Sequence, residues 1–275
     1  MLSNAIGYFG AIGLIGNTIG FYTGLKDTLF HPAPAVGTNN LRVYVGLTNK
    51  DVADEMSLQG SAPALAVWDA GGNFLGQDTP DAGSIIPAGG FRGYAIEGRG
   101  GVDYLSVVQT GNDGVCISSI TVQSANVGLQ FLWTGDIGKA CGAPWYPQRN
   151  AISVDDPRLV PACVWIDGNG DSGHNWKGFN MHVGSFSILG GTDAFDEVTE
   201  LWTANRDLLC RSEPRFSLYE DIKVGSQIRT YITDPTRINS ASQEYADQVL
   251  SSDNWGWGEM PTAGELRSAQ PASPG

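Results

Sequence analysis

Short apolar segments separated by glycine-rich turns are the feature that most constrains the fold of this 275-residue chain. The segments are rich in β-branched residues, and the turns include Asp69-Ala70-Gly71-Gly72 and Gly98-Arg99-Gly100-Gly101. Such strands without intervening helices are typical of antiparallel sandwiches and jelly rolls. We therefore predict a mainly β, antiparallel sandwich or jelly-roll-like domain with strands at 41–48, 64–68, 91–97, 104–110, 115–123, 128–133, 162–166, 179–187 and 227–232.

The domain organisation follows from changes in composition along the chain. Residues 1–30 are hydrophobic and glycine-rich, and the proline-rich stretch after them reads as a stiff linker. We predict a helix over 1–30, the β-sandwich domain over 31–250, and a Ser/Gly/Pro-rich tail over 251–275. Within the domain only 193–209 shows helical periodicity.

The N-terminal segment carries no charge from Leu2 to Leu25, and a helix of that length would be about 36 Å long. Its glycines recur every three or four residues and therefore form one helical stripe, as in small-xxx-small motifs that let helices approach closely. Three interpretations stay open: self-association, insertion into a membrane, and packing against the chain's own β domain. The residues predicted to mediate assembly are Gly16, Gly20, Gly24, Ile12 and Ile19.

Composition and charge exclude several classes of protein. Only 16% of residues are charged and 41% are hydrophobic, which is unlike a disordered chain. The formal net charge of −13 argues against nucleic-acid binding, which needs a basic face to displace counterions.

The chain has four cysteines, Cys116, Cys141, Cys163 and Cys210, and only three histidines. None of the cysteines forms a CxxC pair, so a zinc site with ordinary ligand spacing is not expected. An even number of cysteines in a chain of this composition predicts two disulfides and a secreted, extracellular protein. Three pairings are possible, and four buried thiols in a cytosolic protein are the alternative.

The sequence Asp167-Gly168-Asn169-Gly170-Asp171 places oxygen-bearing side chains at alternate positions. Asp167, Asn169 and Asp171 thereby resemble the first half of a calcium-binding loop, although Gly178 stands where an EF-hand has its bidentate Glu. The competing interpretation is a tight hairpin, because Asp, Asn and Gly favour turns. Tryptophans near this loop suggest a lectin-like, cation-dependent binding module as a further possibility. No catalytic motif and no other cofactor are predicted.

Several short motifs occur in a fixed order through the middle of the chain, and together they carry a family resemblance. They comprise Asn112-Asp113-Gly114-Val115-Cys116-Ile117, Trp133-Thr134-Gly135-Asp136, Cys141-Gly142 with Trp145-Tyr146, and Cys163-Val164-Trp165-Ile166-Asp167-Gly168-Asn169-Gly170-Asp171. Over roughly residues 64–187 the chain resembles a family of uncharacterised secreted proteins from filamentous ascomycete fungi. The resemblance implies secretion and disulfides, and it carries over no activity and no catalytic residues. The chain departs from the family in its glycine-striped start and in Pro147-Gln148 after Trp145-Tyr146.

Together these features predict a non-enzymatic extracellular protein that self-assembles through its N-terminal stripe and has a structural or surface role. The expected partner is a second copy of the chain, with a membrane or a glycan as alternatives and no nucleic acid. A membrane-active effector or pore former is the first alternative function. A lectin-like or calcium-dependent binding module is the second.

Overall fold

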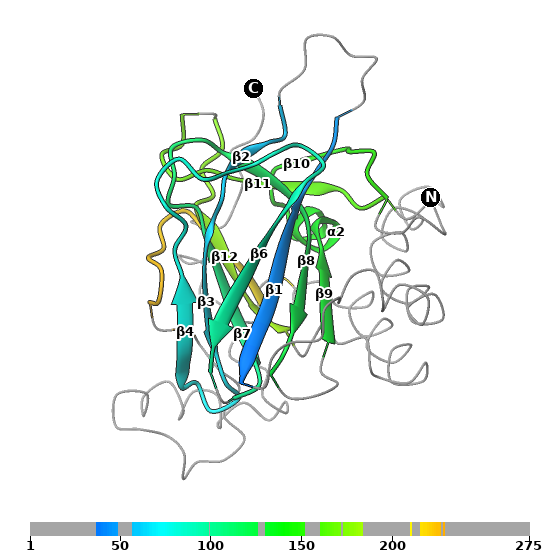
Figure 1. Cartoon of the computed structure of the whole chain (residues 1–275). Coiled ribbons are helices and arrows are strands. Elements are labelled where there is room, and N and C mark those ends of the chain that lie inside the picture. Colours follow the sequence, from blue (N-terminus) through cyan, green and yellow to red (C-terminus); the bar gives the residue numbers. More distant parts are fainter. Residues whose placement is uncertain are drawn as a thin grey trace.

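The computed structural model describes residues 37–48, 57–98, 100–125, 130–151, 160–171, 173–183, 210, 215–226 and 228. These residues form a mainly antiparallel β structure, as predicted, with two large sheets lying one over the other (Figure 1). A two-stranded ribbon of β2 (Gly60–Ser61) and β5 (Ile85–Ile86) completes the sheets. Among the described residues, no helix has both the length and the apolar character needed to cross a bilayer.

The first large sheet has six strands in the order β10-β11-β8-β1-β6, with β9 also paired to β8. Every strand pair in this sheet is antiparallel. The strands are β1 (Thr38–Val45), β6 (Phe91–Glu97), β8 (Val115–Gln123), β9 (Gln130–Thr134), β10 (Trp145–Tyr146) and β11 (Cys163–Ile166).

The second large sheet has five strands in the order β13-β12-β7-β3-β4, again all antiparallel. Its strands are β3 (Ala64–Trp68), β4 (Phe74–Asp78), β7 (Tyr104–Val108), β12 (Gly178–His182) and β13 (Phe216–Tyr219). β3, β7 and most of β12 are buried on both faces, and β3 accordingly has a continuous apolar sequence, Ala-Leu-Ala-Val-Trp, rather than an alternating one.

The hydrophobic core lies between the two sheets. Alternate residues of β1 are buried, including Leu41 and Val43, as expected for a strand with one face against a core. Trp133 of the first sheet stacks on Phe179 and Phe216 of the second, with ring centroids 4.9 and 5.9 Å apart. These aromatic contacts join the sheets into one core.

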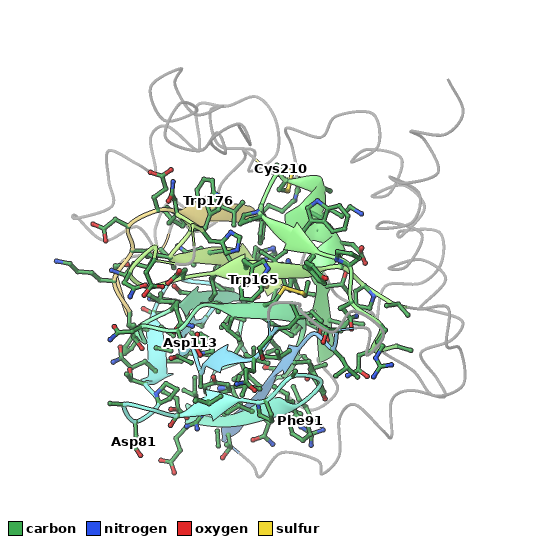
Figure 2. All side chains as sticks on the ribbon, turned by 90° about the horizontal axis from the view of Figure 1, so that it is seen from above. Asp81, Phe91, Asp113, Trp165, Trp176 and Cys210 are labelled. Carbon is green, nitrogen blue, oxygen red and sulfur yellow. A yellow bond between two sulfur atoms is a disulfide. The ribbon has the colours of Figure 1, made fainter. Side chains whose placement is uncertain are left out.

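Two disulfides stabilise the fold and confirm the prediction from the four cysteines. Cys116 of β8 is bonded to Cys163 of the neighbouring β11, close to Trp165 (Figure 2). Cys141 follows the short helix α2 (Gly135–Ala140) and is bonded to Cys210. The structure thus selects one of the three pairings that the sequence left open.

Most predicted strands within the described residues are present. The ranges 64–68, 91–97 and 115–123 match β3, β6 and β8, whereas 41–48 and 128–133 are shifted by a few residues. The sequence missed β4, β13 and α2, together with the two-residue strands β2, β5 and β10. The predicted helices over 1–30 and 193–209, the tail over 251–275 and most of 227–232 lie outside the described residues.

Candidate functional site

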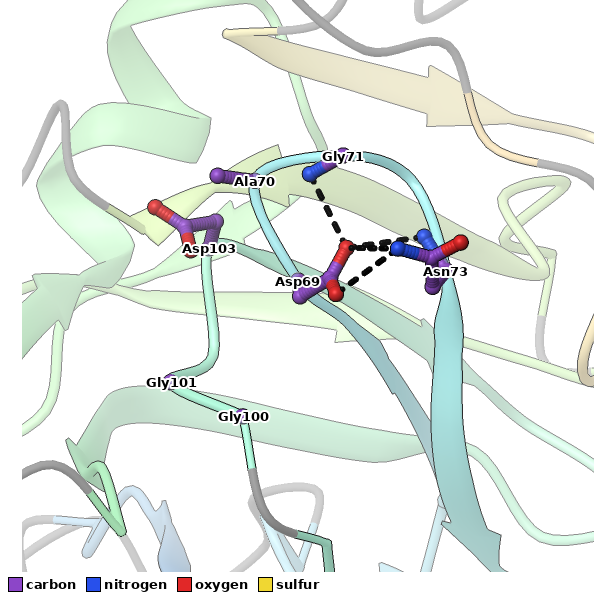
Figure 3. Close-up of a pocket in the computed structure, with 7 residues that line it drawn as sticks. All are labelled: Asp69, Ala70, Gly71, Asn73, Gly100, Gly101 and Asp103. Carbon is purple, nitrogen blue, oxygen red and sulfur yellow. Dashed lines mark hydrogen bonds between the residues drawn. The ribbon is translucent and has the colours of Figure 1, made fainter. Parts of the chain in front are cut away.

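A pocket of about 440 Å³ lies where two glycine-rich turns meet at one end of the five-stranded sheet. One turn joins β3 to β4, and the other leads from β6 into β7. Seven described residues line the pocket (Figure 3): Asp69, Ala70, Gly71, Asn73, Gly100, Gly101 and Asp103. None of these seven is basic, and only Ala70 is apolar, so the pocket suits a polar ligand of positive or neutral charge.

The pairing of β3 with β7 explains why two acidic residues share this pocket. Trp68 is the register partner of Tyr104 in this antiparallel pair. Asp69 follows Trp68 and Asp103 precedes Tyr104, so the two aspartates lie opposite each other just beyond the last paired residues. The backbone N–H of Asp103 donates to the carbonyl of Trp68 at 2.9 Å, and its own carbonyl accepts from Val183 N–H at 2.7 Å. Asp103 is therefore held from both sides.

Asp69 organises the turn that forms one wall of the pocket. Its Oδ1 accepts hydrogen bonds from the backbone N–H groups of Gly71 and Asn73, both at 2.9 Å. Its Oδ2 accepts from Asn73 Nδ2 at 2.9 Å, so Asp69 is turned toward Asn73 (Figure 3). Gly72 has φ 76°, a left-handed conformation that favours glycine in such a turn. The Asp69 carboxylate is thus committed to the turn, although its negative charge still acts in the pocket.

Asp103 is the carboxylate with capacity for a ligand. Partial burial raises the pKa of Asp103, and the nearby charge of Asp69 raises it further. A hydrogen bond from the Ala70 N–H acts in the opposite direction. The second of the two raising effects comes from the negative charge of Asp69, and none of the seven lining residues carries a positive charge that would balance it.

The predicted cation loop adopts the local hydrogen bonds of a turn. Asp167 is buried and its Oδ1 accepts from Asn169 N–H at 3.2 Å. Asn169 Nδ2 donates to Asp171 Oδ2 at 2.9 Å, and Asp171 N–H donates back to Asn169 Oδ1 at 3.2 Å. Within the part of the chain that the structure describes, no group of three or more His, Cys, Asp or Glu side chains is arranged to hold a metal ion. The calcium site at this loop stays a prediction.

The predicted assembly residues Gly16, Gly20, Gly24, Ile12 and Ile19 lie outside the described residues. The pocket was not predicted, although both of its loops were recognised as turns. The sequence did contain a signal for it: Asp69 directly follows the predicted strand 64–68, and Asp103 directly precedes the predicted strand 104–110. Only the pairing of those strands places Asp69 opposite Asp103.

Comparison with known proteins finds little similarity. No protein-family profile matches the chain, and no curated protein matches it. Among solved structures, it is similar to crystal structures of Delta413-417:GS LOX, one of them an anaerobic structure in complex with arachidonate, at 15% identity and a TM-score of 0.28. The match covers 35% of this chain and 14% of the LOX chain. Similarity at this level carries no argument about fold or function.

Proposed function

We propose that this protein is an extracellular, non-enzymatic binding protein whose pocket at Asp69 and Asp103 takes a ligand with an ammonium or guanidinium group. The observation that carries this proposal is the juxtaposition of two carboxylates in a cavity whose described lining contains no basic side chain. A cation placed there would form a charge-assisted hydrogen bond with Asp103 and relieve its repulsion from Asp69. The formal net charge of −13 would also attract cationic ligands over a longer range.

The hydrogen bonds of the lining favour an organic cation over a calcium ion. Calcium takes six to eight oxygen ligands, usually with several carboxylates. Here Asp69 accepts four hydrogen bonds within its own turn, and the Gly100 carbonyl accepts from Asn39 Nδ2 at 3.4 Å. Among the described lining residues, Asp103 is thus the main one whose side-chain oxygens can contact a ligand. One carboxylate suits a single N–H donor group better than the coordination shell of a metal ion.

A ligand panel tests this proposal on the intact protein by NMR. The probes are N-acetyl-lysinamide, N-acetyl-argininamide, glucose and calcium chloride. We expect the two cationic amino-acid amides to shift the backbone amide signals of Asn73, Gly100 and Gly101. Shifts at these residues with glucose or calcium alone would contradict the assigned ligand class, and no shift with any probe would contradict the pocket as a binding site.

Arg99 lies between two residues of this loop in the sequence but outside the described residues. The panel is therefore repeated on an R99Q variant. Removing a positive charge from the loop should tighten the binding of a cation, because the local potential becomes more negative. Weaker binding by R99Q would count against a cationic ligand.

Self-assembly through the N-terminal stripe is the second proposed function, favoured by the spacing of Gly16, Gly20 and Gly24. Assembly would present many copies of the pocket together and so raise avidity for a multivalent partner. Two disulfides in the described part of the chain are compatible with an extracellular setting.

Light scattering on the full chain tests assembly. A bulky G20L substitution on the stripe should reduce the native mass of the oligomer, whereas T18L, two residues away and off the stripe, should leave it unchanged. A monomeric wild-type protein would contradict self-assembly. Leakage of lipid vesicles that G20L abolishes and T18L retains would instead support the pore-forming alternative.

A further inference from the structure

The outer face of the five-stranded sheet carries a row of small and polar side chains that are partners in the strand register. The row contains Gln77, Ala66, Ser106, Asn180 and Ser217, one from each strand. Partners in an antiparallel pair project from the same face. Ser106 of β7 and Asn180 of β12 are therefore neighbours on that face, away from the core between the sheets.

This outer face is covered. Ser106 is 2% exposed and Asn180 is 7% exposed. Ile222 packs near Gly178 on β12, and Ile228 packs with Ala66, Trp68 and Tyr104. The segment after β13 thus crosses over the sheet and shields the polar row from bulk solvent.

Two atoms of the row are buried without a hydrogen-bond partner. Within the described part of the chain, Ser106 Oγ and Asn180 Oδ1 are both in this state. Leaving a buried polar group unpaired is destabilising, so such atoms are rare and call for a physical explanation. Here the two atoms belong to register partners, which points to one explanation for both.

We propose that an ordered water molecule binds between Ser106 Oγ and Asn180 Oδ1. The Asn180 oxygen accepts one water hydrogen, and the Ser106 hydroxyl donates to or accepts from the water, which gives the two or more polar partners that buried waters require. Ala66 and Ser106 are small, whereas Trp68 and Tyr104 in the adjoining row are large. Small side chains thus stand beside the two unpaired atoms, and Ile228 belongs to the hydrophobic cluster that contains Ala66 of the same row.

The site can be observed in the wild-type protein by water–protein NOE measurements. A long-lived water molecule should give a cross-peak to the side-chain amide protons of Asn180, and S106A should remove it. In thermal unfolding, S106A should lower the Tm in the wild-type background and have little effect in an N180L background, because the shared water is already lost. S118A is the matched control, since the buried Ser118 hydroxyl donates to the Tyr44 carbonyl at 3.2 Å and its effect should add to that of N180L.

Two results would overturn the proposal. Coupling between S106A and N180L without a water cross-peak would show that the side chains bond directly to each other. Independent effects of S106A and N180L, again without a cross-peak, would show that the two atoms remain unpaired.

Discussion

Asp103 donates its backbone N–H to the carbonyl of Trp68 at 2.9 Å, and this bond places its carboxyl group opposite Asp69 at the end of the β3–β7 pair. Like charges directly opposite each other across a strand pair are destabilising. The pKa of Asp103 is accordingly raised, first by burial and then by the charge of Asp69. A destabilising arrangement in a pocket is typical of a site kept for binding rather than for stability.

Replacing Asp69 by asparagine should lower the pKa of Asp103. D69N removes the like charge, while the amide oxygen can still accept hydrogen bonds from Gly71 and Asn73. The measurement is an NMR titration of the Asp103 carboxyl carbon, with D81N as the control because Asp81 is exposed in a different turn (Figure 2). An Asp103 pKa that stays unchanged in D69N would show that the two charges do not interact.

Replacing Asp136 by asparagine should stabilise the protein at neutral pH. Asp136 is 8% exposed, its Oδ1 accepts from Ala162 N–H at 3.1 Å, and burial raises its pKa to about 6. A carboxyl group whose pKa is raised by folding costs stability as pH increases from about 4 to 6. At 1.36 kcal/mol per pKa unit the cost approaches about 3 kcal/mol. Urea unfolding should show D136N more stable by about 1–3 kcal/mol at pH 8 and equal to wild type near pH 3.5. A D136N protein that is less stable at pH 8 would contradict this account.

His182 should have the opposite dependence on pH. Its imidazole is partly buried beside Tyr104, with ring centroids 5.0 Å apart, and this burial together with Arg215 lowers its pKa to about 4. The unfolded chain then binds the extra proton first, so stability is complete above pH 6.5 and falls toward pH 4, by up to about 3 kcal/mol. Because Asp136 opposes this change over much of the same range, the loss is best measured in D136N. Adding H182Q to D136N should make the unfolding free energy nearly independent of pH between about pH 4 and 6.5. If the steep pH dependence persists in the double variant, a group other than His182 causes it.

Removing either disulfide should cost about 4 kcal/mol of unfolding free energy by loop-closure entropy, since their sequence separations are 47 and 69. The loss should be larger for the C116A/C163A pair, because both cysteines are fully buried in the core and their removal also leaves a cavity. Cys141 and Cys210 are only partly buried and pack at the edge of that core. Equal Tm losses for the two double variants would show that core packing around Cys116 adds nothing.

The sequence correctly predicted the strands whose own residues form a continuous apolar or β-branched run. The continuous apolar run of β3 and the β-branched run of β8 were both predicted with the observed bounds. β4 was missed because its sequence, Phe-Leu-Gly-Gln-Asp, neither alternates nor forms a continuous apolar run, as suits a partly exposed strand at a sheet edge. The six-residue α2 was missed because it contains two glycines and is fixed by tertiary contacts and the Cys141–Cys210 bond.

The candidate site could not be predicted from the sequence for a different reason. Asp69 and Asp103 are 34 positions apart in the chain (103 − 69), and each alone looks like an ordinary turn residue. Their relation depends on the register of β3 against β7, which sequence periodicity does not determine. The disulfide pairing was open for the same reason, because it depends on β8 lying beside β11.

The most direct test of the binding proposal is the affinity of the full-length protein for N-acetyl-argininamide, measured by calorimetry for wild type, D103N and D81N. D103N removes the charge that would contact the ligand, while its amide oxygen can still accept from the Ala70 N–H. A charge-assisted hydrogen bond is worth about 1.5–3 kcal/mol, so D103N should weaken binding by about tenfold or more. D81N should bind like wild type, since it makes the net charge less negative by the same amount but does so outside the pocket. Equal affinities for D103N and D81N would contradict the assignment of Asp103 and its pocket as the binding site.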